Sequence, residues 1–218
     1  DLKSKKNFFK NRIREPIISV EAQSVLETAD LIIFGPGTQH SSLFPSYLSK
    51  GVGEAISTNK TAEKVFVANT RKDYEIQGET MSSLCSKLHY YLNRKGVINN
   101  PPESYVTRYF IQDPSGLQKK GERYLELESD DFSFPSRQTV IKDWESDIGK
   151  HSGNRVLDEL IAIVNERANI SLKTFSYMIS IIVPVLNEER TLEIVLNKLN
   201  LLNFQPYGLS KEIIVVDG

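Results

Sequence analysis

The chain has 218 residues, 27 of them basic and 28 acidic, so its formal net charge is -1, and 39% of its residues are hydrophobic. This composition is typical of a soluble globular protein and excludes a disordered tail or a small disulfide scaffold. Because the charges nearly cancel and no basic block stands out, the sequence predicts no binding to nucleic acid or to an anionic membrane.

Strands and helices are predicted to alternate through the first half of the chain. The stretch 31–34 is a continuous apolar run between Asp30 and a Gly-Pro-Gly turn, which is typical of a strand buried on both faces of a parallel sheet. We expect, in chain order, a strand at 16–20, a helix at 21–29, the strand at 31–34, short helical pieces at 43–48 and 53–57, a strand at 64–69 and a helix at 80–92. This order predicts a Rossmann-like α/β domain, in which a parallel sheet is flanked by helices.

The second half is less regular until it reaches a βαβ pattern. We expect strands at 105–112 and 123–127 joined by a turn at 114–116, a helix at 155–167, a polar linker at 168–177, and then a strand at 179–185, a helix at 191–202 and a strand at 212–217. The strands of a βαβ unit run parallel, but about 40 residues are too few for an independent core. We therefore expect a first domain at 1–167 and a truncated second one at 178–218, each with its own sheet.

The strand at 31–34 runs into the sequence Gly-Pro-Gly-Thr-Gln-His-Ser-Ser. Ligands of open α/β sheets bind at the carboxyl ends of the strands. Glycine lets a phosphate approach the backbone, hydroxyl groups donate hydrogen bonds, and the amides that open the next helix add partial positive charge. The candidate phosphate-binding residues are Gly35, Gly37, Thr38, Ser41 and Ser42. The alternative is a tight turn followed by a serine helix cap.

These residues, with the preceding Ala-Asp-Leu-Ile-Ile-Phe strand and the following Leu-Phe-Pro, resemble the signature of the 2-phospho-L-lactate transferase (CofD-like) family, which includes the bacterial gluconeogenesis factor. The resemblance covers residues 16–165 and continues through Lys-Val-Phe-Val-Ala-Asn at 64–69 and Gly-Glu-Thr at 78–80. It implies that Asn69, Glu79 and Thr80 also belong to a phosphate or nucleotide site. Glu79 is a candidate to hold a magnesium ion or a ribose hydroxyl, and stabilisation of its own helix is the alternative role.

What the resemblance implies about activity differs between two branches of the family. The transferase branch moves a phospholactyl group from a guanosine-linked donor to a deazaflavin with Mg²⁺, and the regulatory branch binds a sugar nucleotide. The family also opens with a glycine-rich nucleotide loop, which residues 1–28 lack, and commonly has an acid and a glycine where this chain has Met81 and Ser82. We therefore expect a fragment that is inactive as it stands, and we assign no catalytic residue.

A second motif, Ser-Ile-Ile-Val-Pro-Val-Leu-Asn-Glu-Glu followed by Lys-Glu-Ile-Ile-Val-Val-Asp, resembles the opening of a family 2 glycosyltransferase. Pattern alone places two neighbouring strand ends at one crevice. The resemblance implies a proline against the base of a nucleotide sugar and an aspartate on its uracil or ribose. The candidate nucleotide-sugar residues are Pro184, Asn187, Glu188, Glu189 and Asp217. Glutamates that only offset the helix dipole are the alternative.

The remaining signals set limits on cofactor and location. The histidines His40, His89 and His151 have no cysteine or carboxylate at ligand spacing, so we expect no zinc site, and we interpret His40 as a loop residue. The single cysteine, Cys85, cannot form an internal disulfide, and no apolar stretch reaches the about 20 residues of a membrane span. These features predict a cytoplasmic protein without a transmembrane segment.

The motifs together yield one functional hypothesis and one alternative. The hypothesis is a transferase fragment, in which a CofD-like domain that binds a phosphate or nucleotide is joined to a nucleotide-sugar-dependent glycosyltransferase. The alternative is a non-catalytic regulatory module that binds a nucleotide sugar. A nucleotide or nucleotide sugar is the expected ligand, Mg²⁺ is the candidate cofactor, and the sequence leaves a homo-oligomer open.

Overall fold

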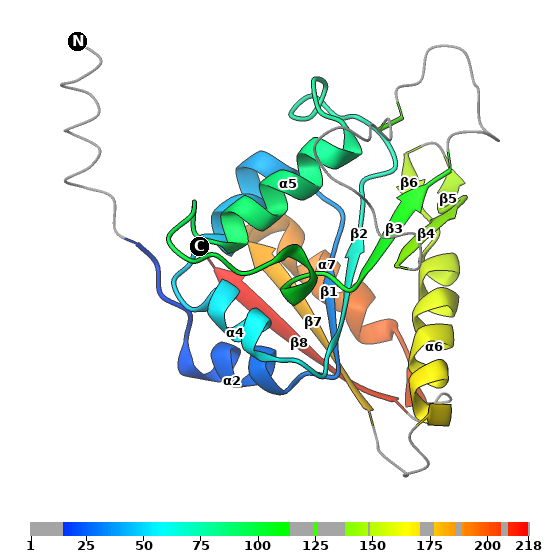
Figure 1. Ribbon diagram of the computed structural model, residues 1–218. Coiled ribbons are helices and arrows are strands. Elements are labelled where there is room, and N and C mark those ends of the chain that lie inside the picture. Colours follow the sequence, from blue (N-terminus) through cyan, green and yellow to red (C-terminus); the bar gives the residue numbers. More distant parts are fainter. Residues whose placement is uncertain are drawn as a thin grey trace.

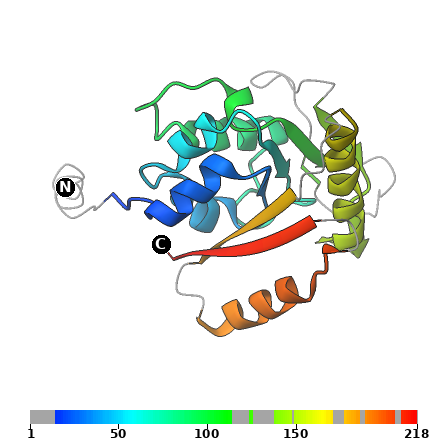
Figure 2. The same ribbon diagram turned by 90° about the horizontal axis from the view of Figure 1, so that it is seen from below.

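The computed structural model describes residues 15–113, 124–125, 138–147, 149–170, 177–185, 189–205 and 209–217. Within these ranges a six-stranded parallel sheet, in the order β4-β3-β2-β1-β7-β8, carries helices on both faces (Figures 1 and 2). The predicted fold class, a Rossmann-like parallel sheet with flanking helices, is confirmed. None of the helices described combines the length and apolar character needed to cross a membrane.

The helices and strands follow the predicted alternation. The first half contains α2 (Val20–Thr28), β1 (Leu31–Phe34), the π-helix η1 (Gln39–Leu43), α3 (Phe44–Tyr47), α4 (Val52–Thr58), β2 (Glu63–Val67), α5 (Met81–Leu92) and the 3-10 helix η2 (Pro102–Ser104). The second half contains β3 (Arg108–Gln112), β4 (Thr139–Lys142), β5 (Glu145–Asp147), β6 (Lys150–His151), α6 (Gly153–Ile170), β7 (Tyr177–Val185), α7 (Glu189–Leu201) and β8 (Leu209–Asp217).

The central strands are buried on both faces of the sheet. In β2, Phe66 packs into a core formed with α2, α3, α4 and α5, while Val65 and Val67 face a second core formed with α6 and Trp144. Figure 2 shows α2 and α4 on one side of the sheet and α6 and α7 on the other. Because both faces are covered, no polar alternation is left in these strands, which is why a continuous apolar run predicted them.

Two predicted strands are wrong in extent. At 16–20 the structure has only an isolated parallel bridge between Ile17 and Lys50, because the Ser19 hydroxyl accepts the amide of Ala22 and starts α2 at Val20. The strand expected at 105–112 begins only at Arg108.

The irregular region after β3 was the least predictable part of the chain. Of the strand expected at 123–127, only Tyr124 and Leu125 are described, and Tyr124 makes an isolated antiparallel bridge with Arg71. The turn at 114–116 lies outside the described residues. The sequence analysis missed β4, which extends the sheet beside β3, and the antiparallel hairpin β5–β6.

The expectation of two separate sheets is wrong. β7 pairs in parallel with the free edge of β1, with Leu31 opposite Ile179 and Ile32 opposite Ser180, so β7 and β8 extend the first sheet. Ile179 is buried in the core that α6 covers, and this burial stabilises the extension. The helix α6 also runs to Ile170, so the first residues of the predicted linker are helical.

The contact between α4 and the end of α5 needs a glycine. A Cβ atom on Gly53 would lie 2.0 Å from the Leu92 carbonyl oxygen, whereas one on Gly153, the first residue of α6, would meet nothing within 4 Å. We predict that Gly53→Ala lowers the free energy of unfolding by about 3 kcal/mol, because the helix backbones must separate. Gly153→Ala is the matched control and is expected to leave stability unchanged or raise it slightly. Equal urea midpoints for the two variants would contradict this account.

Candidate functional site

Two loops meet at the carboxyl ends of β1 and β2. Asn69, which follows β2, donates a hydrogen bond from its amide nitrogen to the Gly37 carbonyl at 2.9 Å and accepts the Gly37 N–H at 3.3 Å. Gln39 donates to the Asn69 amide oxygen at 2.9 Å. The parallel register, with Phe34 opposite Phe66, brings the two strand ends level and so permits this link.

The loop after β1 offers accessible polar groups. The Thr38 and Ser42 hydroxyls lie 2.8 Å apart and are half-buried, and Ser41 is exposed. A Cβ atom on Gly35 would meet nothing within 4 Å, so the backbone there faces open space. The side chain of Gln39 is buried, and its amide oxygen has no hydrogen-bond partner among the described residues. The loop therefore combines several donors and one unmatched acceptor with a backbone that is open at Gly35.

The Glu75 carboxylate accepts hydrogen bonds from backbone N–H groups near the start of η1. One oxygen of Glu75 accepts the N–H groups of His40 at 3.1 Å and Ser41 at 3.2 Å. A hydrogen bond from the Ser41 side chain, the largest effect, and these backbone bonds hold the pKa of Glu75 below its usual value, although partial burial acts to raise it. The amides of His40 and Ser41 thus face a negatively charged oxygen.

Glu79 lies at the same edge but is fully engaged with its neighbours. It contacts His40 at 3.3 Å, accepts the Ser83 hydroxyl at 2.5 Å and pairs with Lys87. Burial acts to raise its pKa, but the hydrogen bonds from Lys87 and Ser83 outweigh it, so the net pKa lies below the usual value. Thr80 caps α5 by accepting the Ser83 N–H at 3.1 Å.

These contacts bear on the expected magnesium ion. Among the residues that the structure describes, no group of three His, Cys, Asp or Glu side chains could hold a metal. Glu79 is the carboxylate that the sequence suggested as a magnesium ligand. Its oxygens already contact Lys87, Ser83 and His40. The described side chains therefore do not fit a magnesium site of their own.

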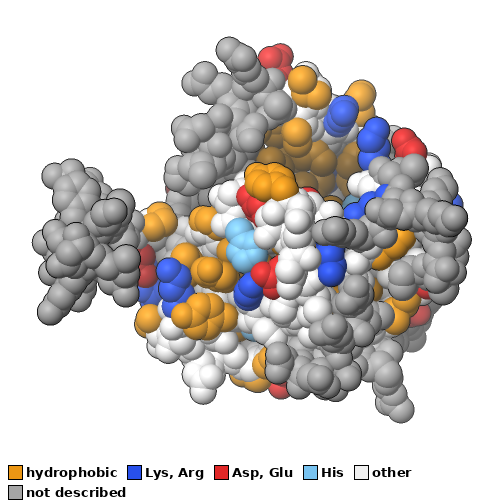
Figure 3. All heavy atoms as spheres, turned by 90° about the horizontal axis from the view of Figure 1, so that it is seen from above, with side chains coloured by type: hydrophobic (Ala, Val, Ile, Leu, Met, Phe, Trp, Pro, Cys, Tyr) orange, Lys and Arg blue, Asp and Glu red, His pale blue; other side chains and the backbone are white. Residues whose placement is uncertain are grey.

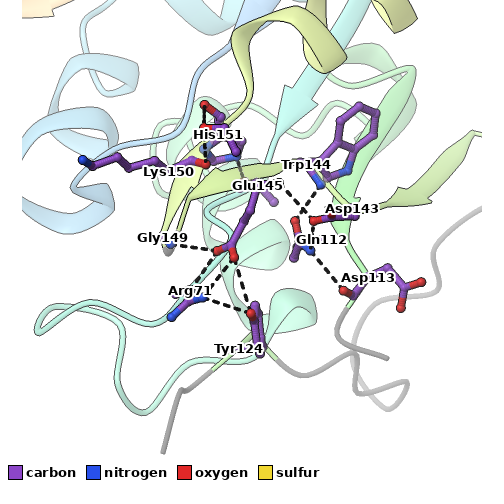
Figure 4. A network of polar contacts seen from close by, with 12 residues as sticks. Arg71, Gln112, Asp113, Tyr124, Asp143, Trp144, Glu145, Gly149, Lys150 and His151 are labelled. Carbon is purple, nitrogen blue, oxygen red and sulfur yellow. Dashed lines mark hydrogen bonds and ion pairs between the residues drawn. The ribbon is translucent and has the colours of Figure 1, made fainter. Parts of the chain in front are cut away.

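A buried ion pair supports the loop after β2 (Figure 4). Arg71 binds both carboxylate oxygens of Glu145 at 2.8 and 3.0 Å, and it also donates to the Tyr124 hydroxyl at 3.0 Å. The Gly149 N–H donates to the same carboxylate at 3.0 Å. Burial raises the pKa of Glu145, but the hydrogen bonds from Arg71 and Thr70 more than offset this effect, so its pKa is lowered.

The hairpin that carries Glu145 is fixed to the sheet as well. His151 on β6 donates from Nε2 to the Ala68 carbonyl at 2.9 Å, and burial lowers its pKa. Trp144 donates its backbone N–H to the Gln112 side chain at 2.8 Å and its indole N–H to the Ile111 carbonyl at 2.9 Å. Loop 69–78 is therefore held from one side by the hairpin and from the other by Gly37.

The second motif is only partly described. Pro184 lies one residue before the end of β7, opposite Val216, and Asp217 ends β8 opposite Val185. Glu189 begins α7, while Asn187 and Glu188 lie outside the described residues. Since all six strands are parallel, these positions share an edge of the sheet with the first loop.

Sequence reasoning missed the acidic residue that touches the first loop. Gly37 contacts Asn69 and Thr38 contacts Ser42 in the structure, whereas Glu75 was overlooked and His40 was set aside. Their meeting depends on how loop 69–78 folds over the strand ends, for which the sequence carries no periodic signal. A carboxylate in a loop that follows a strand end was the only available hint.

Comparison with known proteins identifies relatives over much of the chain. The model of the family described as 2-phospho-L-lactate transferase CofD matches residues 5–140. A candidate gluconeogenesis factor of Thermotoga maritima is 30% identical over 128 residues, covering 56% of this chain and 38% of the relative. One of Vibrio cholerae is 37% identical over 70 residues, covering 32% of this chain and 23% of the relative. The chain thus spans less than half the length of these curated relatives.

Solved structures resemble the chain less closely. The crystal structure of a UPF0052 family member from Bacillus halodurans aligns with a TM-score of 0.49 at 19% identity, covering 66% of this chain and 46% of that protein. A second crystal structure from Bacillus halodurans aligns with the same TM-score at 17% identity, covering 66% of this chain and 47% of that one.

The Arg71–Glu145 pair predicts a stability that depends on pH. Because the pKa of folded Glu145 lies below its unfolded value, its contribution is present above the unfolded pKa and is lost as the pH falls through the folded one. We predict that Glu145→Gln lowers the free energy of unfolding at pH 7 by about 3 kcal/mol, because Arg71 then keeps a half-buried charge without its partner. The deficit shrinks in acid, where wild-type Glu145 is protonated too.

Urea unfolding at neutral and acidic pH measures this difference. Glu103→Gln, which changes an exposed glutamate on η2, is the control and is expected to alter stability by no more than about 0.5 kcal/mol. A deficit for Glu145→Gln that is equal at both pH values would show that the ion pair is not its cause.

Proposed function

The chain belongs to the 2-phospho-L-lactate transferase CofD family, and from this premise we propose that it binds the phosphate of a nucleotide or nucleotide sugar where loops 35–42 and 69–80 meet. The observation that carries the proposal is the hydrogen-bonded link between Gly37 and Asn69. It joins two strand-end loops that hold the donors a phosphate needs. Ligands of parallel sheets bind at this edge.

The chemistry of the loop supports an anionic group there. The hydroxyls of Thr38 and Ser42 are accessible, and the backbone at Gly35 is open to approach. The backbone amides of His40 and Ser41 face a carboxylate of the chain itself, so they are oriented to receive a negatively charged oxygen. Several short donors on one loop are a common way to hold a phosphate.

Two functions are compatible with phosphate binding in this family: regulation by a bound nucleotide sugar, and group transfer. We favour regulation, in which the nucleotide sugar is bound without turnover. The two curated relatives are candidate gluconeogenesis factors, and Glu79 is held in an ion pair with Lys87 rather than left to act on a ligand. Transfer chemistry is the second candidate, because the matching family model is described as a transferase. In either case we propose that magnesium arrives on the phosphates of the ligand, as is common for this ion.

The stretch 178–218 carries a separate proposal, that it opens a family 2 glycosyltransferase unit. β7 and β8 pair in parallel along their full lengths and α7 connects them, which is the arrangement such a unit requires. Pro184 and Asp217 stand near the ends of these two adjacent strands and would frame a donor nucleotide. The proposed domain division at 167 and 178 rests on the same resemblance.

Substitution of one hydroxyl tests the phosphate site. We predict that Thr38→Val weakens the binding of UDP-glucose or GDP by about tenfold in calorimetry with Mg²⁺, because a hydrogen bond to a charged phosphate oxygen is lost. Thr28→Val is the matched control, since Thr28 ends α2 at the opposite edge of the sheet and donates only to the Ser24 carbonyl in the contacts described.

The binding and turnover results distinguish the regulatory function from the transferase function, and they also test whether the proposed site exists. Binding without turnover in a parallel assay of group transfer supports the regulatory function, and turnover supports the transferase. Failure of both nucleotides to bind wild-type protein, or equal affinities for Thr38→Val and Thr28→Val, would count against the site.

A further inference from the structure

We propose that Glu75 is a built-in competitor for the phosphate and so determines the anion affinity of the site. This inference rests on the proposed function, because it concerns the same loop. A single oxygen of Glu75 accepts two consecutive backbone N–H groups, from His40 at 3.1 Å and Ser41 at 3.2 Å. These are the donors that a phosphate oxygen would use.

The loop presents this carboxylate in a defined position. The side chain of Asp73 accepts the N–H groups of Glu75 at 2.8 Å and Ile76 at 3.2 Å, which forms a tight turn. Ile76 is fully buried in the core beside α5 and anchors the turn. Glu75 is therefore held over the loop by its own backbone and not by chance contact of an exposed side chain.

A second, independent observation concerns the side chain of Gln39 in the same loop. The buried side chain of Gln39 donates to Asn69 and Gly37, but its amide oxygen has no hydrogen-bond partner among the described residues. A buried polar atom without a partner costs free energy, so it calls for a donor from outside. A hydroxyl or N–H of a nucleotide is such a donor, and a carboxylate such as Glu75 is not.

The charges around Glu75 bear on how a phosphate would replace its carboxylate on the N–H groups of His40 and Ser41. Asp73, Glu75 and Glu79 are acids of the loop that follows β2, and Lys87 and His40 are basic side chains in contact with Glu79. A phosphate brings more negative charge and more acceptor oxygens than a carboxylate, so it can replace Glu75 on the amides. The two anions repel each other at close range, so the ligand must displace the Glu75 carboxylate and break the hydrogen bond that Glu75 accepts from the Tyr74 hydroxyl at 3.3 Å.

Removal of the charge tests the competition. We expect Glu75→Gln to bind inorganic phosphate and UDP-glucose about tenfold more tightly than wild type, because a neutral amide competes poorly for the amides of His40 and Ser41. Affinity for uridine, which has no charge, should not change. Glu103→Gln removes an equal charge from η2, near the amino ends of the strands, and should bind all three ligands as wild type does.

A measurement without ligand keeps this inference distinct from the proposed function. In NMR spectra of the ligand-free protein, the amide signals of His40 and Ser41 should shift as Glu75 titrates, and Glu75→Gln should abolish that shift. Wild type and Glu75→Gln that bind phosphate equally would overturn the competition while the site itself stands. If neither protein binds any anion although the shift is seen, the proposed function fails and the competition fails with it. Absence of the shift would overturn the contact.

Discussion

The site depends on the hydrogen bonds between Asn69 and Gly37. Parallel pairing of β1 and β2 brings two strand ends level, but strand pairing stops at the last residues of the strands, and a loop beyond that point has many conformations. The Asn69 side chain bonds both backbone groups of Gly37 and so continues the link past the end of the sheet. The loop that carries Thr38, Ser41 and Ser42 is therefore tied to Asn69, which follows β2.

The ion pair between Arg71 and Glu145 stabilises the loop that follows β2. Arg71 and Glu145 form a bidentate pair that is worth little when both are present but costly to break, because a lone buried charge remains. The pair ties loop 69–78 to the hairpin β5–β6, and the hairpin is itself fixed to β2 through His151. The geometry of the loop is therefore set by these long-range contacts together with the local turn that Asp73 forms with Glu75 and Ile76.

Two glutamates, Glu75 and Glu79, lie beside the proposed phosphate site. Glu75 lies on the backbone amides and Glu79 is neutralised by Lys87 and by contact with His40. In a chain whose total charge is near zero, anion binding depends on such local arrangements and not on a general field. Under the proposal, the Glu75 carboxylate that accepts the N–H groups of His40 and Ser41 makes the affinity of the site adjustable by a single residue.

The sequence alone determined the order of strands and helices from α2 to β3 and from α6 to β8, the buried apolar runs and the loop at 35–42, because period, turn residues and burial are local properties of the chain. It did not reveal β4 or the hairpin β5–β6. It could not determine that β7 joins β1 in one sheet, since the free edge of β1 accepts any apolar parallel strand and the pattern does not say which. It could not reveal Glu75 on the amides of His40 and Ser41, or Arg71 on Glu145 across 74 positions, because such contacts exist only after the chain has folded. Tertiary structure decided these points, since hydrogen bonds between distant loops depend on where the sheet places their ends.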